Sequence, residues 1–315
     1  MMSMRILHID TNHPILREQL AAAGFENVAD YHCTYTELID QINQFDGLIL
    51  RSRLPIDKNL LEKTTRLQFI GRVGAGLENI DIETAKKQGI QVFAVPEGNE
   101  NAVGEHALGM LLSLLNRLEI AHREMQAGIW KRAENRGFEL EGKTIGIIGY
   151  GRMGNSFAKK LNGFNCKVLA VDIIPALGNQ WAQQVPLEVL QNEADIISLH
   201  VPQTPETYHL IDAAFIAACK KPFWIVNTAR GAVVDTKALI DGLDSGGVLG
   251  ACLDVHEFES KSFENLTQHP LLTRLIADER VLMTPHIAGW THESHFKMAN
   301  ILAEKIIDWK QKSTQ

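Results

Sequence analysis

The chain has 315 residues, of which 45% are hydrophobic and 22% are charged, and its formal net charge is −7 at pH 7. This composition is typical of a folded globular protein and excludes a disordered chain, a collagen-like chain and a disulfide-rich mini-scaffold. The acidic charge balance argues against nucleic acid or an anionic membrane as a partner. At roughly 150 residues per domain, the length predicts about two domains.

Nothing in the sequence predicts a membrane segment or an export signal. The longest apolar stretch, residues 107–115, contains Ser113 and is about half of what a bilayer requires. The first apolar run, 6–9, leads directly into Asp10 and is too short for a signal peptide. The four cysteines are scattered without a CxxC pair, which favours a reduced, cytoplasmic protein.

Short β-rich runs alternate with helical patterns along the first hundred residues. Strands are predicted at 4–9, 47–50, 67–70 and 91–95. One helix is predicted from Pro14 to Gly24 and another from Asp81 to Gly89. This βαβ order predicts a parallel sheet with helices on both faces.

A long helix is predicted from Asn99 to about Gly128. Its stretch 107–112 is apolar almost all round, which is typical of a helix buried between domains or subunits. We therefore expect a homodimer, with simple core packing as the alternative explanation of the apolar stretch.

A second βαβ series begins at Lys143. Its predicted strands are 144–148, 167–171, 195–199, 223–226, 248–253 and 281–283. Several of them are continuous runs of Val, Ile and Leu, as in strands buried on both faces. A final helix is predicted from about 291 to 312.

A G-x-G-x-x-G pattern, Gly149, Gly151 and Gly154, follows the predicted strand 144–148 and opens a helix at Arg152. In dinucleotide-binding folds, the first glycine permits the tight turn, the second lets the backbone approach a pyrophosphate, and the third lets helix and strand pack closely. The backbone N–H groups of Arg152 and Met153 are then expected to meet the phosphates. The alternative is a purely structural glycine turn.

Asp172 lies 23 positions after the first glycine, directly beyond the next predicted strand. A carboxylate there accepts hydrogen bonds from the adenosine ribose hydroxyls and repels a 2′-phosphate. No Arg or Lys occurs between Asp172 and Gln180. The pattern therefore predicts NAD in preference to NADP.

Three later strands are each followed by side chains suited to carbonyl reduction. These side chains are Arg230, then Asp254, Glu257, Glu259 and Glu264, and finally His286. Because ligands bind at the carboxyl ends of the strands, we expect these groups to face one crevice beside the nucleotide. There an Arg can hold a carboxylate, a His can transfer a proton and a carboxylate can orient the imidazole. Alternatively, the Arg makes a structural ion pair and the His is a turn residue.

Over nearly its whole length the chain resembles the NAD-dependent D-isomer-specific 2-hydroxyacid dehydrogenases. The motifs that carry the resemblance are VGAGLENID at 73–81, ELEGKT at 139–144, the glycine pattern, HVP at 200–202, NTARG at 227–231 and TPHIAG at 284–289. The resemblance implies that Arg230 binds substrate, that Glu259 tunes the histidine, and that His286 is the acid and base.

The resemblance also implies further binding residues. For NAD they are His200, Val201, Pro202, Thr228, Ala229, Asp254 and Gly289. For the substrate carboxylate they are the backbone N–H groups of Ala75 and Gly76.

The fold class implied is α/β with two doubly wound parallel-sheet domains. A Rossmann NAD domain, 99–289, is inserted into a discontinuous flavodoxin-like substrate domain made of 1–98 and the C-terminal helix in 290–315. The site is expected in the cleft, where hinge closure would exclude water.

Two departures from the family pattern occur after the fifth strand of the second series. His256 stands where the family usually has Phe, and Ser260 where it has Pro. Glu259 keeps its spacing of five residues from Asp254, with Glu257 as the alternative carboxylate. Trp290, directly after the histidine motif, either narrows the pocket or packs the hinge.

Arg51 and Arg53 follow the predicted strand 47–50 and suit a charged substrate. Within the family this looks most like the D-3-phosphoglycerate dehydrogenase branch, which implies 3-phosphoglycerate and phosphohydroxypyruvate as substrates and a role in serine biosynthesis. The chain ends at Gln315 after the closing helix, so we expect no C-terminal regulatory domain. Surface ion pairs are the alternative role of the two arginines.

Other functions remain open. They are hydroxypyruvate or glyoxylate reduction, phosphite oxidation, and an NAD-sensing role like that of the family's corepressor relatives. Formate oxidation is disfavoured, since the formate enzymes have Gln where Glu259 stands. His292 and His295 lack partners with zinc-like spacing, so we expect no metal. His256 and His269 have no assigned role.

Overall fold

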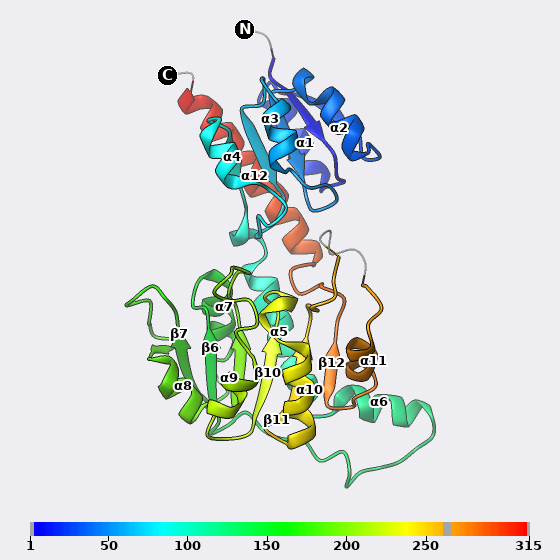
Figure 1. Cartoon of the computed structure of the whole chain (residues 1–315), viewed down its shortest axis with the longest axis vertical. Coiled ribbons are helices and arrows are strands. Elements are labelled where there is room, and N and C mark those ends of the chain that lie inside the picture. The colour runs from blue at the N-terminus through cyan, green and yellow to red at the C-terminus, as the bar shows by residue number, and fades with distance from the viewer. Residues whose placement is uncertain (1–2, 261–265, 314–315) are drawn as a thin grey trace. The chain divides into compact units, whose positions relative to one another are not determined.

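The computed structural model describes residues 3–260 and 266–313. Within these ranges the chain divides into two compact units (Figure 1). Unit 1 runs from the N-terminal end to Asn99 and continues from Trp290. Unit 2 comprises Glu100–Glu259 and Leu266–Gly289.

Unit 1 contains a five-stranded parallel sheet in the order β2-β1-β3-β4-β5, which is the strand order of flavodoxin-like folds. The strands are β1 (Arg5–His8), β2 (Glu26–Ala29), β3 (Gly47–Leu50), β4 (Phe69–Arg72) and β5 (Gln91–Phe93). The helices are α1 (Pro14–Ala22), α2 (Tyr35–Gln41), η1 (Ile42–Gln44), α3 (Lys58–Lys63), α4 (Ile82–Lys87), η2 (Pro96–Gly98) and α12 (His292–Ser313).

The C-terminal helix α12 completes the core of unit 1. Leu302 and Ile306 are fully buried beside the side chains of α1 and the sheet. A Cβ atom at Gly71 in β4 would lie only 3.2 Å from Leu302, so this strand packs closely against the helix. The ring of Trp309 lies 5.3 Å from that of Phe69. The last helix is therefore part of the same core as the first hundred residues.

Unit 2 contains a seven-stranded parallel sheet in the order β12-β11-β10-β9-β6-β7-β8. The strands are β6 (Thr144–Ile148), β7 (Lys167–Val171), β8 (Gln183–Gln184), β9 (Ile196–Leu199), β10 (Phe223–Asn227), β11 (Val248–Leu253) and β12 (Val281–Met283). The helices are α5 (Glu100–Leu115), α6 (Leu118–Gln126), α7 (Arg152–Lys160), α8 (Leu187–Glu193), α9 (Ala213–Ala218), η3 (Gly231–Val233), α10 (Thr236–Ser245) and α11 (Pro270–Ile276).

The sheet of unit 2 is buried on both faces. Ile147 and Ile148, neighbours in β6, pack into two different hydrophobic clusters because successive side chains of a strand point to opposite faces. The prediction of two parallel-sheet α/β domains is therefore confirmed. In the part of the chain that the structure describes, no helix is both long enough and apolar enough to cross a bilayer.

The single long helix predicted from Asn99 to Gly128 is wrong, because α5 ends at Leu115 and α6 begins at Leu118. Arg117 between them has a left-handed backbone with φ of 53°, which an α-helix cannot contain. The Asn116 side chain donates to the carbonyl of Leu112 and so satisfies a group at the helix end.

Several short elements were not predicted, among them β2, β8, α2 and α3. Strand β2 lies at the edge of its sheet and exposes both of its end residues, so it lacks the apolar run that marks a buried strand. Short elements of this kind are held by tertiary contacts more than by their own sequence pattern.

Two glycines of α5 allow a matched test of its packing. A Cβ at Gly104 would lie 3.1 Å from the carbonyl carbon of Ser156 in α7, whereas one at Gly109 would meet nothing within 4 Å. We expect Gly104→Ala to lower the free energy of unfolding by about 1–3 kcal/mol through overpacking. Gly109→Ala should raise it by roughly 0.5–1 kcal/mol through helix propensity. Urea denaturation measures both, and changes of the same sign would contradict this packing.

A buried histidine in β1 should make stability depend on pH. Burial lowers the pKa of His8 to about 4, while its Nε2 atom lies 2.8 Å from Oδ1 of Asn27. Between its ordinary pKa and pH 4, only the unfolded chain binds the proton, so stability falls as pH falls. We expect the wild-type protein to lose on the order of 1–2 kcal/mol more than His8→Phe between pH 7 and pH 5. The exposed His32, changed to Phe, is the control, and equal pH dependence in all three proteins would refute the expectation.

Candidate active site

The glycine pattern forms a tight turn between β6 and α7. Gly149 has φ of 89°, and a Cβ there would lie 2.6 Å from the carbonyl oxygen of His200. A Cβ at Gly154 would lie 2.1 Å from the carbonyl oxygen of Gly149. Neither position tolerates a side chain. The loops after β6 and β9 are therefore in direct contact at the point where the strand order of the sheet reverses, which is where such folds bind ligands.

The first turn of α7 is open, as a phosphate site requires. Gly151 is the N-cap and makes no side-chain capping bond, and a Cβ there would meet nothing within 4 Å. A cavity of about 440 Å³ begins at this turn and is lined by Gly151, Arg152 and Lys159, among others. Uncapped N–H groups at a helix N-terminus attract anions. The turn therefore fits a dinucleotide pyrophosphate.

Asp172 is fixed by the backbone around it. Its Oδ2 accepts from the N–H of Tyr150 at 2.7 Å, and its Oδ1 accepts from the N–H of Ile174 at 2.9 Å. Each carboxylate oxygen can accept a second hydrogen bond. The residue thus links the glycine turn to the end of β7 and keeps acceptor capacity for a ribose.

Two buried polar atoms at the ends of β9 and β10 have no hydrogen-bond partner among the described residues: Nδ1 of His200 and Oγ1 of Thr228. Burial lowers the pKa of His200 to about 3, so its ring is neutral, and Nε2 lies 2.9 Å from Oγ of Ser198. Because buried polar atoms are ordinarily hydrogen bonded, these two fit a site that a bound molecule completes.

His286 and Glu259 form a hydrogen-bonded pair. Nδ1 of the histidine lies 2.8 Å from Oε2 of the glutamate, and both side chains are largely buried. This contact leaves Nε2 as the atom that can exchange a proton with a substrate. His286 has a left-handed backbone with φ of 55°, a conformation that His adopts more readily than most residues.

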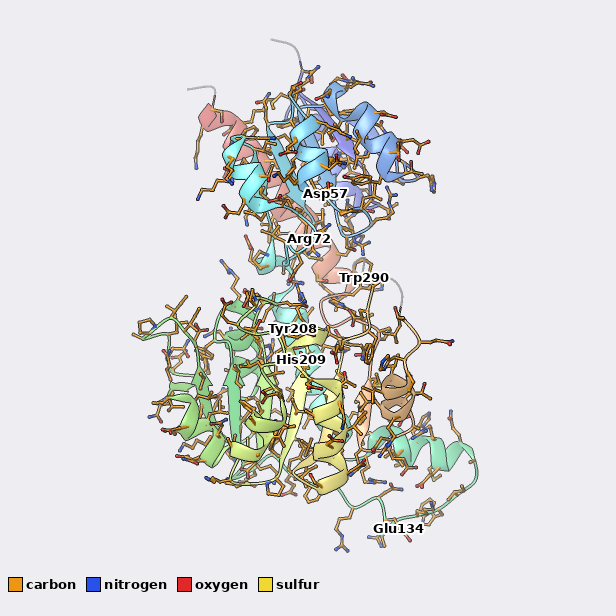
Figure 2. All side chains as sticks on the ribbon, in the orientation of Figure 1. Asp57, Arg72, Glu134, Tyr208, His209 and Trp290 are labelled. Atoms are coloured by element: carbon orange, nitrogen blue, oxygen red, sulfur yellow. The ribbon has the colours of Figure 1, made fainter. Side chains whose placement is uncertain are left out.

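The alternative carboxylate, Glu257, is used elsewhere. Its Oε1 lies 2.8 Å from Nε2 of His209, and its Oε2 accepts from the N–H of Thr236 at 3.0 Å. The ring of His209 stacks on that of Tyr208, with centroids 4.1 Å apart (Figure 2). Glu264, the last carboxylate of the predicted set, lies outside the described residues.

Asp254 holds the loop that carries this histidine. Its Oδ1 accepts from Oγ1 of Thr284 at 2.5 Å and from the N–H of Ile287 at 2.9 Å, and its Oδ2 accepts from the N–H of Ala288 at 2.8 Å. Burial alone would raise the pKa of this carboxyl, but the hydrogen bonds from His106, Thr284, Ala288 and Ile287 hold it below its usual range. The carboxylate is therefore ionised and bound to the loop.

His106 contacts the same loop, although no sequence motif points to it as a functional residue. Its Nε2 lies 3.1 Å from Oγ1 of Thr284 and 3.4 Å from Oδ1 of Asp254. It belongs to α5, whose sequence pattern indicates only an apolar helix. No spacing signal connects positions 106 and 284, because only the fold brings α5 to this loop.

The turn that carries Arg230 is shaped by the buried side chain of Asn227, which was also missed as a functional candidate. Its Nδ2 donates to the carbonyl of Arg230 at 2.9 Å, and its Oδ1 accepts from the N–H of Ala229 at 3.0 Å. Asn227 is the last residue of β10, and its two side-chain hydrogen bonds stabilise the turn that follows the strand. Arg230 itself is partly exposed.

The loops with Arg230, Glu259 and His286 follow β10, β11 and β12, which are neighbouring parallel strands. All three therefore start from the same edge of the sheet, as does the glycine turn after β6. This edge combines a cation, an acid–base pair and an anion-binding helix N-terminus.

Unit 1 uses its two predicted substrate arginines differently. The Arg51 guanidinium lies 3.9 Å from the ring centre of Trp290, a cation–π contact. The Arg53 guanidinium donates within the unit, to the carbonyls of Ile9 at 2.8 Å and Cys33 at 2.7 Å. Trp290 is half exposed and packs on Arg51.

Ala75 and Gly76 lie in the partly exposed loop after β4. Their backbone N–H groups donate to no acceptor within residues 3–260 and 266–313. The neighbouring N–H of Val73, by contrast, donates to the carbonyl of Leu50 at 2.9 Å. The loop thus offers two successive donors.

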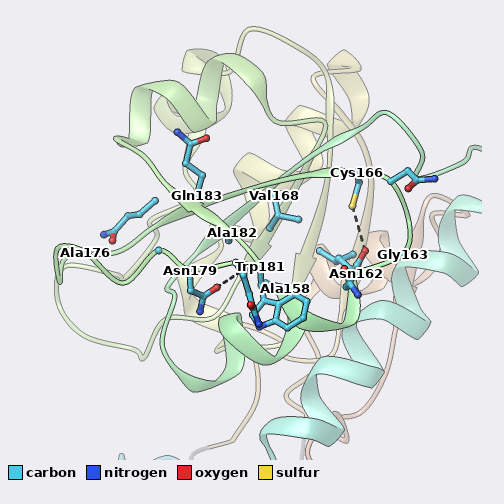
Figure 3. A pocket seen from close by; sticks show the side chains of 15 residues that line it. Ala158, Asn162, Gly163, Cys166, Val168, Ala176, Asn179, Trp181, Ala182 and Gln183 are labelled. Carbon is cyan, nitrogen blue, oxygen red and sulfur yellow. Dashed lines mark hydrogen bonds between the residues drawn. The ribbon is translucent and has the colours of Figure 1, made fainter.

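A cavity of about 910 Å³ lies elsewhere in unit 2, beside β7 and β8, and its 15 lining residues include none with a charge (Figure 3). Some of its amides are already used: Oδ1 of Asn179 accepts from Oη of Tyr150 at 2.8 Å and from the N–H of Trp181 at 2.9 Å. Its lining contains no Arg, Lys or His and no carboxylate, so it offers no cation for a substrate carboxylate and no acid–base pair. The candidate active site is therefore the charged edge and not this cavity.

Comparisons with known proteins agree with this geometry. Residues 108–288 match the family described as D-isomer specific 2-hydroxyacid dehydrogenase, NAD binding domain. The chain is 34% identical over 308 residues to D-3-phosphoglycerate dehydrogenase of Sus scrofa, covering 96% of this chain and 56% of that one. It spans about half the length of the curated relatives it matches first.

Two solved structures resemble nearly the whole chain. The TT0316 protein of Thermus thermophilus is 30% identical, with a TM-score of 0.83 over 96% of this chain and 95% of that chain. D-lactate dehydrogenase of Aquifex aeolicus, solved with NAD and lactic acid, is 28% identical, with a TM-score of 0.83 over 98% of this chain and 96% of that chain. The chain belongs to the D-isomer-specific 2-hydroxyacid dehydrogenase family, and unit 2 contains its NAD-binding domain.

Proposed function

We propose that the chain transfers a hydride between NAD(H) and a small anionic D-2-hydroxy acid or 2-oxo acid, with 3-phosphoglycerate and phosphohydroxypyruvate as the preferred pair. The observation that carries the proposal is the His286–Glu259 hydrogen bond of 2.8 Å, formed on strands next to the one that presents Arg230. An acid–base pair beside a guanidinium is the set of groups that carbonyl reduction needs.

Each of the three side chains has a proposed role. Arg230 binds the substrate carboxylate and polarises the adjacent carbonyl. His286 gives a proton to the carbonyl oxygen from Nε2 and takes it back in the reverse direction, while Glu259 orients the ring through Nδ1. Bound NADH supplies the hydride.

The loops of unit 2 supply the residues that would hold NAD. They are Gly149, Gly151, Arg152, Met153, Gly154, Asp172, His200, Val201, Pro202, Thr228, Ala229, Asp254 and Gly289. The fixed carboxylate of Asp172 supports NAD in preference to NADP, since it repels a 2′-phosphate. Asp254 would contribute to NAD binding indirectly, by holding the loop of Ile287 and Ala288 that leads to Gly289.

We propose that unit 1, which contains the predicted segments 1–98 and 290–315, is the substrate domain. The backbone N–H groups of Ala75 and Gly76 suit a carboxylate, and Arg51 suits a distal phosphate. The 34% identity to D-3-phosphoglycerate dehydrogenase supports this preference. With 3-phosphoglycerate as its substrate, the chain would act in serine biosynthesis.

One observation favours a second candidate, the reduction of hydroxypyruvate or glyoxylate. The Arg53 guanidinium already donates to the carbonyls of Ile9 and Cys33, and Trp290 covers one face of Arg51. This arrangement presents less positive charge to a phosphate than two outward-facing arginines would.

A panel of 2-oxo acids tests the function and separates the candidates. NADH oxidation is measured with phosphohydroxypyruvate, hydroxypyruvate, glyoxylate and pyruvate, and repeated with NADPH. We expect turnover with NADH, and the highest kcat/KM with phosphohydroxypyruvate. His286→Asn, which tolerates the left-handed backbone, should lower kcat at least about a hundredfold because acid–base catalysis is lost.

The exposed His32→Asn is the control for that variant and should retain wild-type turnover. A protein that binds NADH but turns over no 2-oxo acid would refute the proposal and favour an NAD-sensing role. Full activity in His286→Asn would show that the proton comes from another group.

We also propose a homodimer, held by α6 and the segment after it and not by α5, whose apolar side chains pack inside unit 2. In Figure 2 Glu134 lies within this segment, between α6 and β6. Exposed apolar side chains gather along it, with exposed fractions of 57% at Leu118, 77% at Trp130 and 55% at Phe138. Clustered exposed apolar side chains mark protein–protein contacts.

Trp130→Ser should weaken this dimer, because large aromatic side chains commonly carry most of an interface's binding energy. Light scattering over a dilution series should show a dimer for the wild type and dissociation at a concentration at least about tenfold higher for the variant. Ile276→Ser, at another exposed apolar residue of unit 2, should leave the mass unchanged. A monomeric wild type would rule the dimer out.

The state of the cysteines is relevant to the cellular compartment in which the protein works. All four are free thiols, and Cys33 and Cys252 are buried. Burial raises the pKa of Cys219 to about 11, so its reactive thiolate is scarce. Free, unreactive thiols support our proposal of a cytoplasmic enzyme.

A further inference from the structure

His256 has no role in the mechanism above, yet it lies between the two carboxylates that organise the site. It belongs to the loop after β11, between Asp254 and Glu259, and stands where the sequence resemblance leads one to expect Phe. Its side chain is partly buried. Its contacts therefore decide what the replacement does.

The ring of His256 is bonded to the loop that carries His286. Its Nε2 lies 3.0 Å from the carbonyl oxygen of Thr284. A carbonyl oxygen only accepts, so Nε2 carries a hydrogen and donates it. Thr284 precedes His286 by two residues, and the same carbonyl accepts the N–H of His286 at 3.1 Å. The imidazole thus holds the tight turn that gives His286 its left-handed backbone.

The backbone of His256 is bonded to the other member of the pair. Its N–H donates to Oε1 of Glu259 at 2.5 Å, while Oε2 of that glutamate lies 2.8 Å from Nδ1 of His286. One residue therefore holds the glutamate through its main chain and the histidine loop through its side chain.

The His256 peptide has little room to move. A Cβ at Gly231, next to Arg230, would lie 2.0 Å from the carbonyl carbon and oxygen of His256. The cavity between these segments is only about 10 Å³. On the far side, Glu257 is bonded to His209 and Thr236. The backbone of His256 is therefore held in place, and its imidazole has a fixed starting point from which to reach the Thr284 carbonyl.

We propose that His256 is a positioning residue, whose imidazole N–H ties the Thr284 carbonyl to the Glu259 loop and so sets the geometry of the Glu259–His286 pair. This inference rests on the proposed function. A Phe at this position would fill similar space but would donate no hydrogen bond, so the histidine loop would keep only its bonds to residues such as Asp254 and His106.

Two substitutions separate the hydrogen bond from the bulk of the ring. His256→Phe keeps an aromatic ring and removes the donor, whereas the side-chain amide of His256→Gln places an N–H near the position of Nε2. We expect the Phe variant to lower kcat for the best 2-oxo acid about tenfold to a hundredfold, the range expected for a misplaced catalytic group. KM for NADH should stay within about twofold, because the glycine turn is untouched. The Gln variant should recover most of kcat, and His32→Phe is the control for an exposed histidine.

A second measurement needs neither turnover nor cofactor. In protein labelled with 13C at histidine Cε1, the signal of His286 is assigned by its loss in His286→Asn. We expect this signal at the same position in the wild type and the Gln variant, and displaced or broadened in the Phe variant. If His256→Phe does not fold, His256→Asn, whose shorter amide cannot reach the carbonyl, takes its place and is expected to behave as Phe.

Three results would overturn the proposal. They are an unchanged kcat and His286 signal in the Phe variant, a fall in Tm alone, and a Gln variant as impaired as the Phe variant. Absence of turnover in the wild type would instead refute the proposed function, and the His286 signal would still decide the role of His256.

Discussion

The candidate active site depends on a single buried carboxylate. Asp254 binds one hydroxyl and two successive backbone N–H groups of the loop after β12, and these hydrogen bonds outweigh burial, which by itself would raise the pKa of the carboxyl. An ionised, buried carboxylate is costly unless its oxygens are fully paired. The loop is therefore held closely, and His286 can keep a left-handed backbone at the position where its ring meets Glu259.

The sheet supplies the arrangement on which this loop is built. Three parallel strands in sequence, β10, β11 and β12, end at one edge, and the strand order reverses between β6 and β9. Contact between Gly149 and His200 at that reversal leaves an uncapped helix N-terminus beside it. The same geometry that packs the sheet thus offers anion binding and proton transfer along one edge, which is the basis of the dehydrogenase function proposed here.

Much of this was predictable from local pattern. Alternation of apolar strands and helices predicted two parallel-sheet units, because strands buried on both faces must be continuously apolar. The spacing of glycines after 144–148 predicted the turn and the start of α7. The break of α5 at Arg117 was not predictable, since it depends on an Asn116 side chain bonding back to the helix. The edge strand β2 lacked the apolar run that marks its neighbours.

The sequence by itself determined the fold class, the family and the loops that carry Arg230 and His286, because these follow from periodicity and from motifs that are contiguous in the chain. Only the tertiary structure decided that Glu259, and not Glu257, contacts His286, that Arg53 is bonded inside unit 1, and that His106 and His256 reach Thr284. The physical reason is that a hydrogen bond depends on where two atoms meet in space. His106 and His256 lie 178 and 28 positions from Thr284, and no sequence pattern links residues so far apart.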